Sequence, residues 1–405
     1  MADCALNSID WNAIRDQFMY DPEVTYLNTG SYGLPPRRAY EQLQRDREAM
    51  SRRPVRFLWQ EFPERIWKAR ATLASFLGVD FHYLPFMVNV TAALNTVALG
   101  FKERLRGDVL LTDQEYGAMV YLWQEVARRH GVRCRTVRLP TGVGVTVEEV
   151  VRRFEQALGE GDVGLVFVSH VTYMSGMRLP VERIVQLARQ AGALTVIDGA
   201  HAPGMFPLDI SAIGCDFYGG NCHKWLAAPI NAGFLWVRPE CEPLIHPIVV
   251  SWGWEYDENS KHERNEYGST PWLRSFEFQG TRDPCPWLAV PEAIAVQHAI
   301  GRERIWNRIR ELANRTRQII TQPGWIEPWF EGDEELYSGV TGFRLPDTVD
   351  PQRLQRYLWQ EHRVIVPAWE LPIGKCLRVS THIYNSEADL DRLAAALRAF
   401  RAVQS

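Results

Sequence analysis

One lysine in this chain, Lys224, stands between a histidine and a tryptophan and between two apolar stretches. Lysine is scarce here, because only five of the 45 basic residues are lysines. The ordinary interpretation is a surface lysine whose stem covers apolar side chains while its ammonium stays in water. In a dry pocket, a lysine amine is instead a nucleophile toward an aldehyde. Lys224 is therefore a candidate for covalent chemistry.

A second candidate group follows a buried-strand pattern in the segment VIDGAHAP. Asp198 in that position is ordinarily a helix or turn cap. A carboxylate there also suits a pyridinium nitrogen, which it keeps protonated so that the ring accepts electrons. His201, three residues further on, is placed to hydrogen-bond a phenolate oxygen. Neither residue is diagnostic alone, and the interpretation depends on both occurring before Lys224.

The segment NVTAALN, residues 89–95, passes from a strand pattern into a helical one. Thr91 is ordinarily a capping residue, but helix N-termini also bind phosphate through their free N–H groups. The chain contains no GxGxxG or Walker motif, so the sequence gives no support to a nucleotide-binding fold.

The elements that must position these residues alternate between strand and helix. Near-continuous apolar stretches separated by helical patterns predict a mostly parallel sheet covered on both faces. Ligands of such sheets lie beyond the carboxyl ends of the strands, where the polar candidates stand. The expected strands are 86–90, 109–112, 163–169, 194–197 and 232–237, and the expected helices are 91–102, 118–130 and the one that ends at Gly192.

After about residue 282 the pattern changes to long helices followed by short strands, which predicts a separate α+β domain. The expected elements there are 288–300, 302–318, 339–345, 363–366, 377–380 and 389–400. We expect three parts: an N-terminal arm (1–35) that packs with the small domain, a large domain (36–285) and the small domain (286–405). Residues 251–286, rich in Trp, Gly and charge, are expected to form a long functional loop.

Composition excludes several classes of protein. A net charge of −4 gives no basic field for nucleic acid or an anionic membrane. No apolar stretch approaches a membrane span, and the first residues lack a signal-peptide pattern, so we expect a cytoplasmic protein. Seven scattered cysteines predict no disulfide framework. Cys215, Cys222 and His223 lack the second close pair that a zinc site needs, and no metal is expected.

Seven segments in this order resemble the landmarks of class V aminotransferases, which are fold-type I enzymes dependent on pyridoxal 5'-phosphate (PLP). The resemblance runs from Tyr26 to Asn385 and is strongest to the isopenicillin N epimerase-like branch, which includes cysteine-conjugate lyases. The segments are NVTAALN, EYGA, SHVTYMSG, VIDGAHAPG, NCHKWL, QGTRD and LRVSTHIYN.

The resemblance implies a role for each matched residue. Lys224 would form the Schiff base with PLP, Asp198 would pair with the pyridine nitrogen, and His201 would approach the ring hydroxyl. Tyr116 would stack on the ring, and Thr281 would reach the phosphate of a neighbouring subunit in a homodimer. The phosphate would be held by Val90, Thr91, Asn221 and His223, and the substrate by Arg378, which binds its carboxylate, and by Asn28.

Two positions depart from related patterns. Tyr173 stands where many relatives have Asn beside the ring hydroxyl, which puts that contact in doubt. Cys376 is the one cysteine near the expected site in the small domain, and a core cysteine is the favoured interpretation. The sequence therefore argues against a desulfurase that forms a persulfide on its own cysteine.

The shared chemistry is loss of the Cα proton of an amino acid. We favour β-elimination of a cysteine S-conjugate in lincosamide-like antibiotic metabolism. Epimerisation, transamination and decarboxylation coupled to oxidative deamination are alternatives, and a catalytically inactive PLP-binding regulator is a remote one. Four tryptophans could form a wide aromatic mouth that accepts a bulky substrate. The equal alternative is that they form part of a dimer interface. They are Trp252, Trp254, Trp272 and Trp287.

Overall fold

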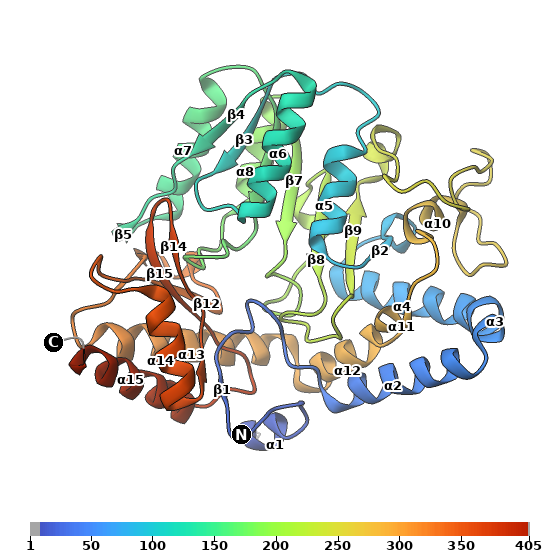
Figure 1. The fold of residues 1–405 in the computed structure, drawn as a ribbon. Helices are drawn as coiled ribbons and strands as arrows, with labels where there is room; N and C mark the ends of the chain where they lie inside the picture. The colour runs from blue at the N-terminus through green and yellow to red at the C-terminus, as the bar shows by residue number, and fades with distance from the viewer. Residues whose placement is uncertain (1–8, 404–405) are drawn as a thin grey trace, which may run out of the picture.

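The structure, a computed structural model, describes residues 9–403. Its centre is a seven-stranded sheet in the order β2-β9-β8-β7-β6-β3-β4 (Figure 1). The strands from β8 to β4 pair in parallel, whereas β9 pairs antiparallel with β8 and β2. The mostly parallel sheet is confirmed. Its strands are β2 (Phe86–Met87), β3 (Asp108–Thr112), β4 (Cys134–Val137), β6 (Val163–Ser169), β7 (Leu194–Gly199), β8 (Phe217–Asn221) and β9 (Gly233–Val237).

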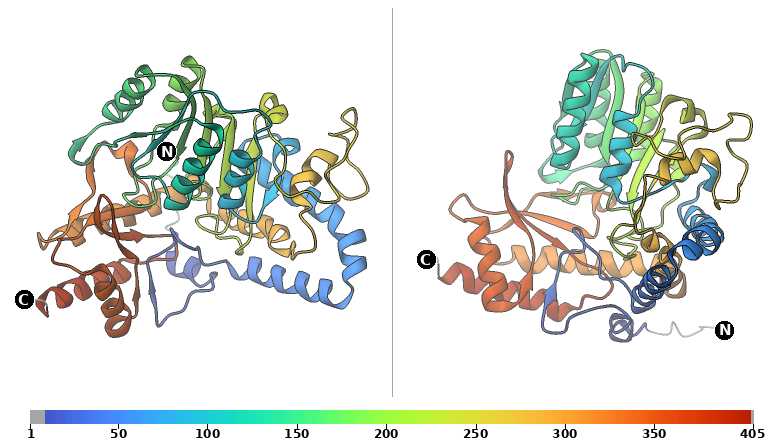
Figure 2. Two further views of the ribbon diagram at one scale, coloured as in Figure 1. Left: turned by 45° about the horizontal axis from the view of Figure 1, so that its top comes forward. Right: turned by 45° about the vertical axis from the view of Figure 1, so that its right-hand side comes forward.

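Successive side chains of each strand enter two different apolar layers, because side chains alternate across a sheet. In β6, Leu165 and Phe167 pack with helices α5 and α6, whereas Val166 and Val168 pack with α7 and α8. Figure 2 shows helices on both sides of the sheet. Covered faces explain why the strands are apolar throughout rather than alternating. These helices are α5 (Val90–Leu99), α6 (Gly117–His130), α7 (Val147–Gly159) and α8 (Val181–Gln190).

The C-terminal part contains an antiparallel four-stranded sheet in the order β10-β12-β15-β14. Leu377 and Val379 of β15 pack with Leu390 and Leu393 of α15 in a separate core. The expected α+β arrangement is confirmed. Its elements are β10 (Glu327–Pro328), β12 (Val340–Arg344), β14 (Ala368–Leu371), β15 (Gly374–Ser380), α13 (Arg302–Thr321), α14 (Pro351–His362) and α15 (Glu387–Ala402).

Helices near both ends of the expected large domain share one core. Ala39 and Leu43 of α2, Leu73 of α4 and Ala293 of α12 belong to the same apolar cluster. Helix α12 lies beyond the boundary expected at residue 285, yet it packs on helices from the beginning of the chain. The helices are α2 (Arg37–Arg52), α4 (Phe62–Leu77), α11 (Cys285–Leu288) and α12 (Val290–Ile300).

The N-terminal arm lies against the C-terminal part. Its short strand β1 (Thr25–Tyr26) pairs in parallel with β13 (Val364–Ile365). Helix α1 (Trp11–Arg15) precedes this strand, and residues 1–8 of the expected arm lie outside the described residues. Among residues 9–403, no helix combines the length and the apolar character needed to cross a membrane.

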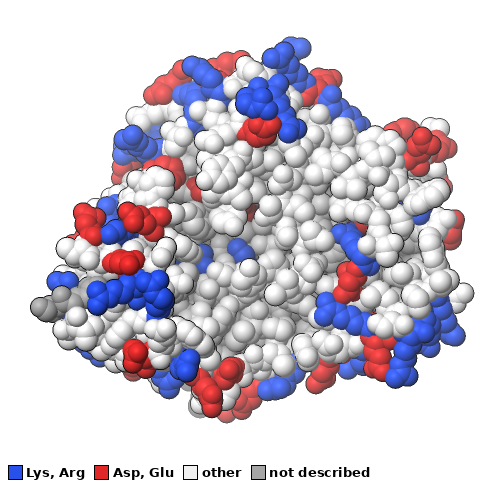
Figure 3. All heavy atoms as spheres, in the orientation of Figure 1, with Lys and Arg blue, Asp and Glu red and all other residues white. Residues whose placement is uncertain are grey.

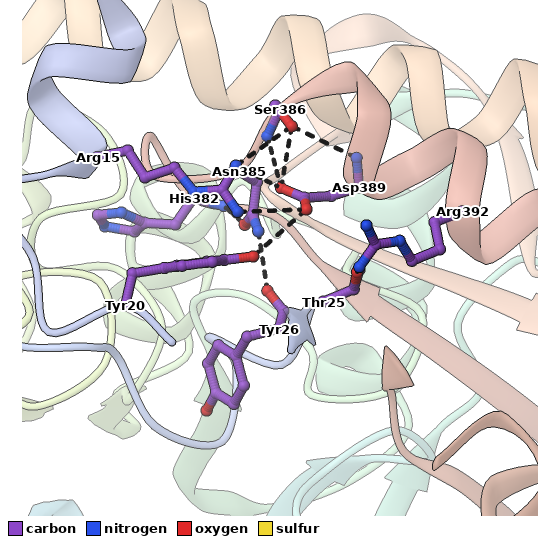
Figure 4. A network of polar contacts seen from close by, with 9 residues as sticks. All are labelled: Arg15, Tyr20, Thr25, Tyr26, His382, Asn385, Ser386, Asp389 and Arg392. Carbon is purple, nitrogen blue, oxygen red and sulfur yellow. Dashed lines mark hydrogen bonds and ion pairs between the residues drawn. The ribbon is translucent and has the colours of Figure 1, made fainter. Parts of the chain in front are cut away.

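A polar network anchors the arm to the first turn of α15 (Figure 4). The Asp389 carboxylate accepts hydrogen bonds from Tyr20 Oη at 3.3 Å and Arg15 Nη2 at 3.4 Å. Asp389 and Ser386 form a capping box at the same helix end. Asn385 Nδ2 donates to the Tyr26 carbonyl at 2.8 Å. Burial, followed by the charge of Asp389, raises the pKa of Tyr20 to about 12, so this phenol stays a donor.

Replacement of Asp389 should therefore loosen the arm. Asp389→Ala removes both a helix cap and the acceptor for two arm side chains, and we expect the free energy of unfolding to fall by about 1–3 kcal/mol. Urea denaturation measures this change. Asp391→Ala, which removes an exposed carboxylate from the same helix, is the matched control and should change stability little. Equal effects of the two substitutions would contradict the anchoring role.

Candidate active site

A cavity of about 630 Å³ opens at the carboxyl ends of the central strands. Figure 3 shows a hollow on this face, lined mostly by uncharged surface with basic atoms inside it. Side chains from β7, β8, α5, β14 and the N-terminal arm meet there. Of the residues expected from the sequence, the lining includes Val90, Thr91, Tyr116, Tyr173, Asp198, His201, Asn221, His223, Lys224 and Arg378.

Lys224 follows β8 in a tight turn, and its amine faces the cavity. Its Nζ lies 3.4 Å from His201 Nε2. Burial lowers the pKa of Lys224 to about 8, and the nearby Arg378 charge acts in the same direction while Asp198 opposes it. The amine therefore has a substantial neutral fraction near physiological pH, which a nucleophilic lysine requires.

Asp198 stands at the end of β7 and is buried. Its Oδ1 accepts the N–H of Ala200 at 2.8 Å, and no basic side chain among the described residues forms an ion pair with it. Burial raises the pKa of this carboxyl group. A buried carboxylate without a cation is the partner that a protonated ring nitrogen would need.

The N-terminus of α5 forms another part of the wall. The Asn221 side chain accepts the Val90 N–H at 2.9 Å, and the Asn89 side chain accepts the Ala92 N–H at 2.8 Å. Asn221 thus orients the helix end, with its Nδ2 left as a donor. His223 Nδ1 is buried without a partner among the described residues, and burial lowers the pKa of this imidazole to about 4.

Arg378 belongs to β15, and its side chain lines another wall of the cavity. Its Nη2 donates to Asn28 Oδ1 and Ser31 Oγ, each at 2.8 Å, and its Nη1 donates to the Tyr173 carbonyl at 3.1 Å. All of these acceptors are neutral, and Nε has no partner among the described residues. Burial lowers the pKa of Arg378 to about 10. This guanidinium is therefore a buried cation that lacks a carboxylate.

Two glycines allow the N-terminal arm to approach this site. A Cβ on Gly30 would lie 2.7 Å from Ser380 Oγ and 3.1 Å from the Arg378 guanidinium carbon. A Cβ on Gly33 would lie 1.9 Å from the Lys224 carbonyl oxygen. The Gly33 N–H donates to the carbonyl of His223, the residue that precedes Lys224. Asn28 reaches the site through Arg378 and does not line the cavity itself.

An aromatic wall adjoins Arg378. The rings of Tyr116 and Tyr173 lie 5.6 Å apart, and those of Tyr173 and Trp369 lie 6.2 Å apart. The Arg378 guanidinium lies 5.0 Å from the Trp369 ring centre. Trp369 and Leu371 were not expected from the sequence, although they precede Arg378 by nine and seven residues on the paired strand β14.

Glu115, buried behind the cavity, was not expected from the sequence either. Its carboxylate accepts from Ser169 N at 3.0 Å, Ser169 Oγ at 2.5 Å and Thr112 Oγ1 at 2.6 Å. Burial raises the pKa of Glu115 to about 7. Glu115 belongs to the EYGA segment, so its position next to Tyr116 is the signal that could have identified it.

The expected aromatic mouth is wrong for Trp272 and Trp287, which are buried. Trp272 is 1% exposed and belongs to the core, and Trp287 is also buried. Trp252 is 84% exposed, and none of the chosen tryptophans lines the cavity that contains Lys224. The expected loop also contains the helix α10 (Pro271–Glu277), which carries Trp272 into an apolar cluster with Leu273 and Phe276.

Thr281 and Cys376 lie apart from the cavity. Thr281 lines a second, largely apolar cavity of about 230 Å³ beside Trp287, so its expected contact with a phosphate stays a prediction about a partner subunit. Cys376 is buried with Met174 and Trp329, and burial raises the pKa of its thiol to about 12. A thiol in that environment is a core residue.

Comparison with known proteins identifies the family. The chain matches the family described as aminotransferase class-V over residues 37–393. It is 43% identical over 393 residues to isopenicillin N epimerase of Amycolatopsis lactamdurans, with 96% of this chain and 98% of the relative covered. The chain belongs to the aminotransferase class-V family. The resemblance that the motifs indicated is confirmed.

More distant relatives of this class V enzyme have other activities in their names. Hercynylcysteine sulfoxide lyase of Schizosaccharomyces pombe is 24% identical, over 98% of this chain and 99% of the relative. The solved structure of the cystine C–S lyase C-DES with its product cysteine persulfide superposes with a TM-score of 0.80 at 22% identity, over 93% of this chain and 97% of that one. At that identity the likeness shows the fold alone.

The cavity fits the cofactor PLP on its own chemistry. A lysine amine, an unpaired buried carboxylate and a helix N-terminus match the aldehyde, ring nitrogen and phosphate of that molecule. Asn221 and Asn89 accept the first-turn N–H groups on either side of Thr91, whose own N–H is bonded to no residue among those described. The open hydrogen-bonding positions therefore correspond to the cofactor's polar groups.

Borohydride reduction tests the covalent position. We expect the purified protein to lose its visible absorption band and to carry the reduced adduct on Lys224, as peptide mass spectrometry would show. Lys224→Ala should lose the adduct and the activity, because no other amine lines the cavity among the described residues. Lys102→Ala, at an exposed lysine, is the control. An adduct on another lysine would overturn the assignment.

Proposed function

We propose that this PLP enzyme removes the Cα proton of a free α-amino acid, with Lys224 as the base. The observation that carries the proposal is one cavity that holds both a lysine amine and a guanidinium without a carboxylate partner. When bound, the cofactor supplies a conjugated ring that accepts the electrons of a breaking Cα bond. Every other task falls to side chains of this chain.

The roles of the cofactor-binding residues follow from their environments. Asp198 would face the ring nitrogen, His201 the ring hydroxyl, and Tyr116 a face of the ring. Thr91, His223 and the Asn221 amide nitrogen would bind the phosphate. Val90 would contribute shape, because its N–H already donates to Asn221.

Arg378 is proposed to bind the substrate carboxylate. Its planar fork matches two carboxylate oxygens, and Asn28 and Ser31 fix the plane of that fork. A carboxylate would also satisfy the charge that the protein leaves unpaired. With the carboxylate held there, the rest of the amino acid would extend along Tyr173 and Trp369, which leaves room for a bulky side chain.

Lys224 is proposed to carry the proton at Nζ. A pKa near 8 allows the same group to accept a proton and to return it, since both forms are populated close to physiological pH. His201 Nε2 lies next to that amine and adds no second positive charge, because burial holds the His201 pKa well below its ordinary value.

For the fate of the substrate, we propose first C–S cleavage of a cysteine S-conjugate in specialised, antibiotic-type metabolism. No cysteine is among the described residues that line the cavity, so sulfur would leave on the substrate fragment rather than on a protein thiol. The relative named hercynylcysteine sulfoxide lyase supports this chemistry.

Epimerisation is the second candidate, favoured by a specific observation. Two relatives with 43% and 41% identity, from Amycolatopsis lactamdurans and Streptomyces clavuligerus, are named isopenicillin N epimerase. Epimerisation needs a proton donor on the face of Cα away from Lys224. Tyr116 and Tyr173 are phenols in the cavity wall and are the candidates for that donor.

A homodimer also belongs to this proposal. Thr281 lies outside the Lys224 cavity of its own chain, and the family resemblance assigns it to the phosphate of a second subunit. A dimer would give Thr281 a phosphate that its own subunit does not offer.

Arg378→Lys should separate carboxylate recognition from folding. The variant keeps the positive charge but loses the fork, and each lost charge-assisted bond is worth about 1.5–3 kcal/mol, so kcat/KM should fall by about two orders of magnitude. Cofactor absorbance and melting temperature should change less. An amino-acid amide, which has no carboxylate, should react equally with both proteins. Unchanged kcat/KM for the free acid would contradict the carboxylate role.

Incubation in D₂O with cysteine S-conjugates, isopenicillin N and sulfur-free analogues tests the reaction itself. Elimination would give a thiol, pyruvate and ammonia, whereas epimerisation would return the substrate inverted and carrying one deuterium at Cα. A keto acid that retains the substrate side chain would indicate transamination, and an aldehyde would indicate decarboxylation. Mass spectrometry and chiral chromatography distinguish these outcomes. Absence of Cα deuterium exchange with every amino acid would contradict the proposal, and Lys224→Ala is the control.

A further inference from the structure

Trp225 follows Lys224 in the chain, and its side chain reaches the Lys224 amine through a histidine. The indole is fully buried, and it does not line the cavity that contains Lys224. Its Nε1–H donates to His201 Nδ1 at 3.2 Å. The other ring nitrogen, Nε2, lies 3.4 Å from Lys224 Nζ. The indole, the imidazole and the amine thus form one chain of contacts.

The chemistry of these groups fixes where the His201 proton lies. An indole N–H is only a donor, so Nδ1 must act as an acceptor. Burial lowers the His201 pKa well below its ordinary value, and the charges of Lys224 and Arg378 act in the same direction. The imidazole is therefore neutral and carries its single proton on Nε2, directed at Lys224.

The indole itself is held firmly. The Trp225 carbonyl accepts from His382 Nε2 at 3.0 Å and from Gln297 Nε2 at 3.3 Å. The indole ring also packs against Gly339, where a Cβ would lie 2.6 Å from its outer edge. The Trp225 main chain is thus held by two side chains, and Gly339 leaves the ring little room to move.

We propose that Trp225 is a positioning residue that fixes His201 as the Nε2–H tautomer and so favours the neutral amine of Lys224. This inference rests on the proposed function, in which Lys224 is the reacting amine. A neutral amine accepts the Nε2–H in its lone pair, whereas an ammonium has no acceptor to offer. The opposite tautomer would present a lone pair to the ammonium and stabilise it.

The other charged groups around Lys224 do not replace this effect. Arg378, from β15, disfavours the ammonium, and Asp198, from β7, favours it. The neighbouring His223 is itself kept neutral by burial. Arg378, Asp198 and His223 form no hydrogen bond with Lys224 Nζ in the described part of the chain, whereas His201 lies within hydrogen-bonding distance of it. Its tautomer therefore decides whether that contact favours the amine or the ammonium.

Trp225→Phe tests the proposal, because it removes the N–H and keeps the aromatic ring. In the full-length chain freed of cofactor, competitive acetylation at graded pH, read by peptide mass spectrometry, reports the neutral fraction of Lys224. We expect the labelling midpoint to move to higher pH and the Lys224 reactivity at pH 7 to fall about threefold to tenfold, since one pKa unit is a tenfold change. The other four lysines serve as internal references.

Trp123→Phe is the matched control, because Trp123 is equally buried and its Nε1 has no partner among the described residues. It should leave the Lys224 profile unchanged. An unchanged profile in Trp225→Phe, or an equal shift in both variants, would overturn the inference. Loss of the borohydride adduct from Lys224 in the unsubstituted protein would instead reject the proposed function, so the two failures are distinguishable.

A second measurement needs no Trp225 variant. Long-range ¹H–¹⁵N spectra of the unsubstituted holoenzyme labelled at histidine report which ring nitrogen carries the proton. His201→Gln identifies the resonance by its disappearance. We expect a protonated Nε2 and an unprotonated Nδ1 at His201. The reverse pattern would overturn the inference even if Trp225→Phe does not fold.

Discussion

The buried guanidinium of Arg378 is the interaction on which this site depends. It joins three parts of the chain, because β15 supplies it while Asn28 and Ser31 of the arm and the carbonyl of Tyr173 bind it. A buried cation is costly unless it is paired, and these neutral oxygens pair it incompletely. Its charge contributes to the lowered pKa values of Lys224 and His201. In the proposed function, this one unpaired cation would select an anionic substrate, and its charge helps to keep the lysine amine neutral.

The opposite end of the cavity has the complementary arrangement. Asp198 is a buried anion without a cation, and burial already raises its pKa in this structure. Lys224 lies between the two unpaired charges, where Asp198 and Arg378 act on its pKa in opposite directions. A cofactor with a protonatable ring nitrogen and a substrate with a carboxylate would each supply a missing partner. The protein therefore leaves unmade the two ion pairs that its proposed ligands would complete.

Membership of the family indicates the first step, which takes place at Cα of an amino acid, but it does not indicate which product follows. Relatives named epimerases and relatives named lyases share this fold, and both reactions begin at Cα. The later steps depend on groups that contact the substrate beyond Cα. In the proposed site of this chain those groups would be the aromatic wall of Tyr116, Tyr173 and Trp369. The wall comes from three different segments, so small changes in it would redirect the product without altering the Lys224 end of the site.

The sequence by itself determined the mostly parallel sheet and the residues at its carboxyl edge. Asp198 could be located because it follows an expected strand with a clear apolar pattern, and the ends of parallel strands meet at one edge. Lys224 could be located because it is a scarce lysine between two apolar stretches, although the strand before it, β8 (FYGGN), was not expected. Arg378 could be placed on a cleft face because side chains alternate along β15. These are local properties, and local sequence carries them. Only the tertiary structure decided the neutral partners of Arg378, the Trp225 contact with His201, the burial of Trp272 and the place of Trp369. Those features arise between segments far apart in the chain, such as Arg378 and Asn28, which are 350 residues apart. Periodicity specifies which face a residue occupies, but packing of the whole chain decides which residue lies opposite.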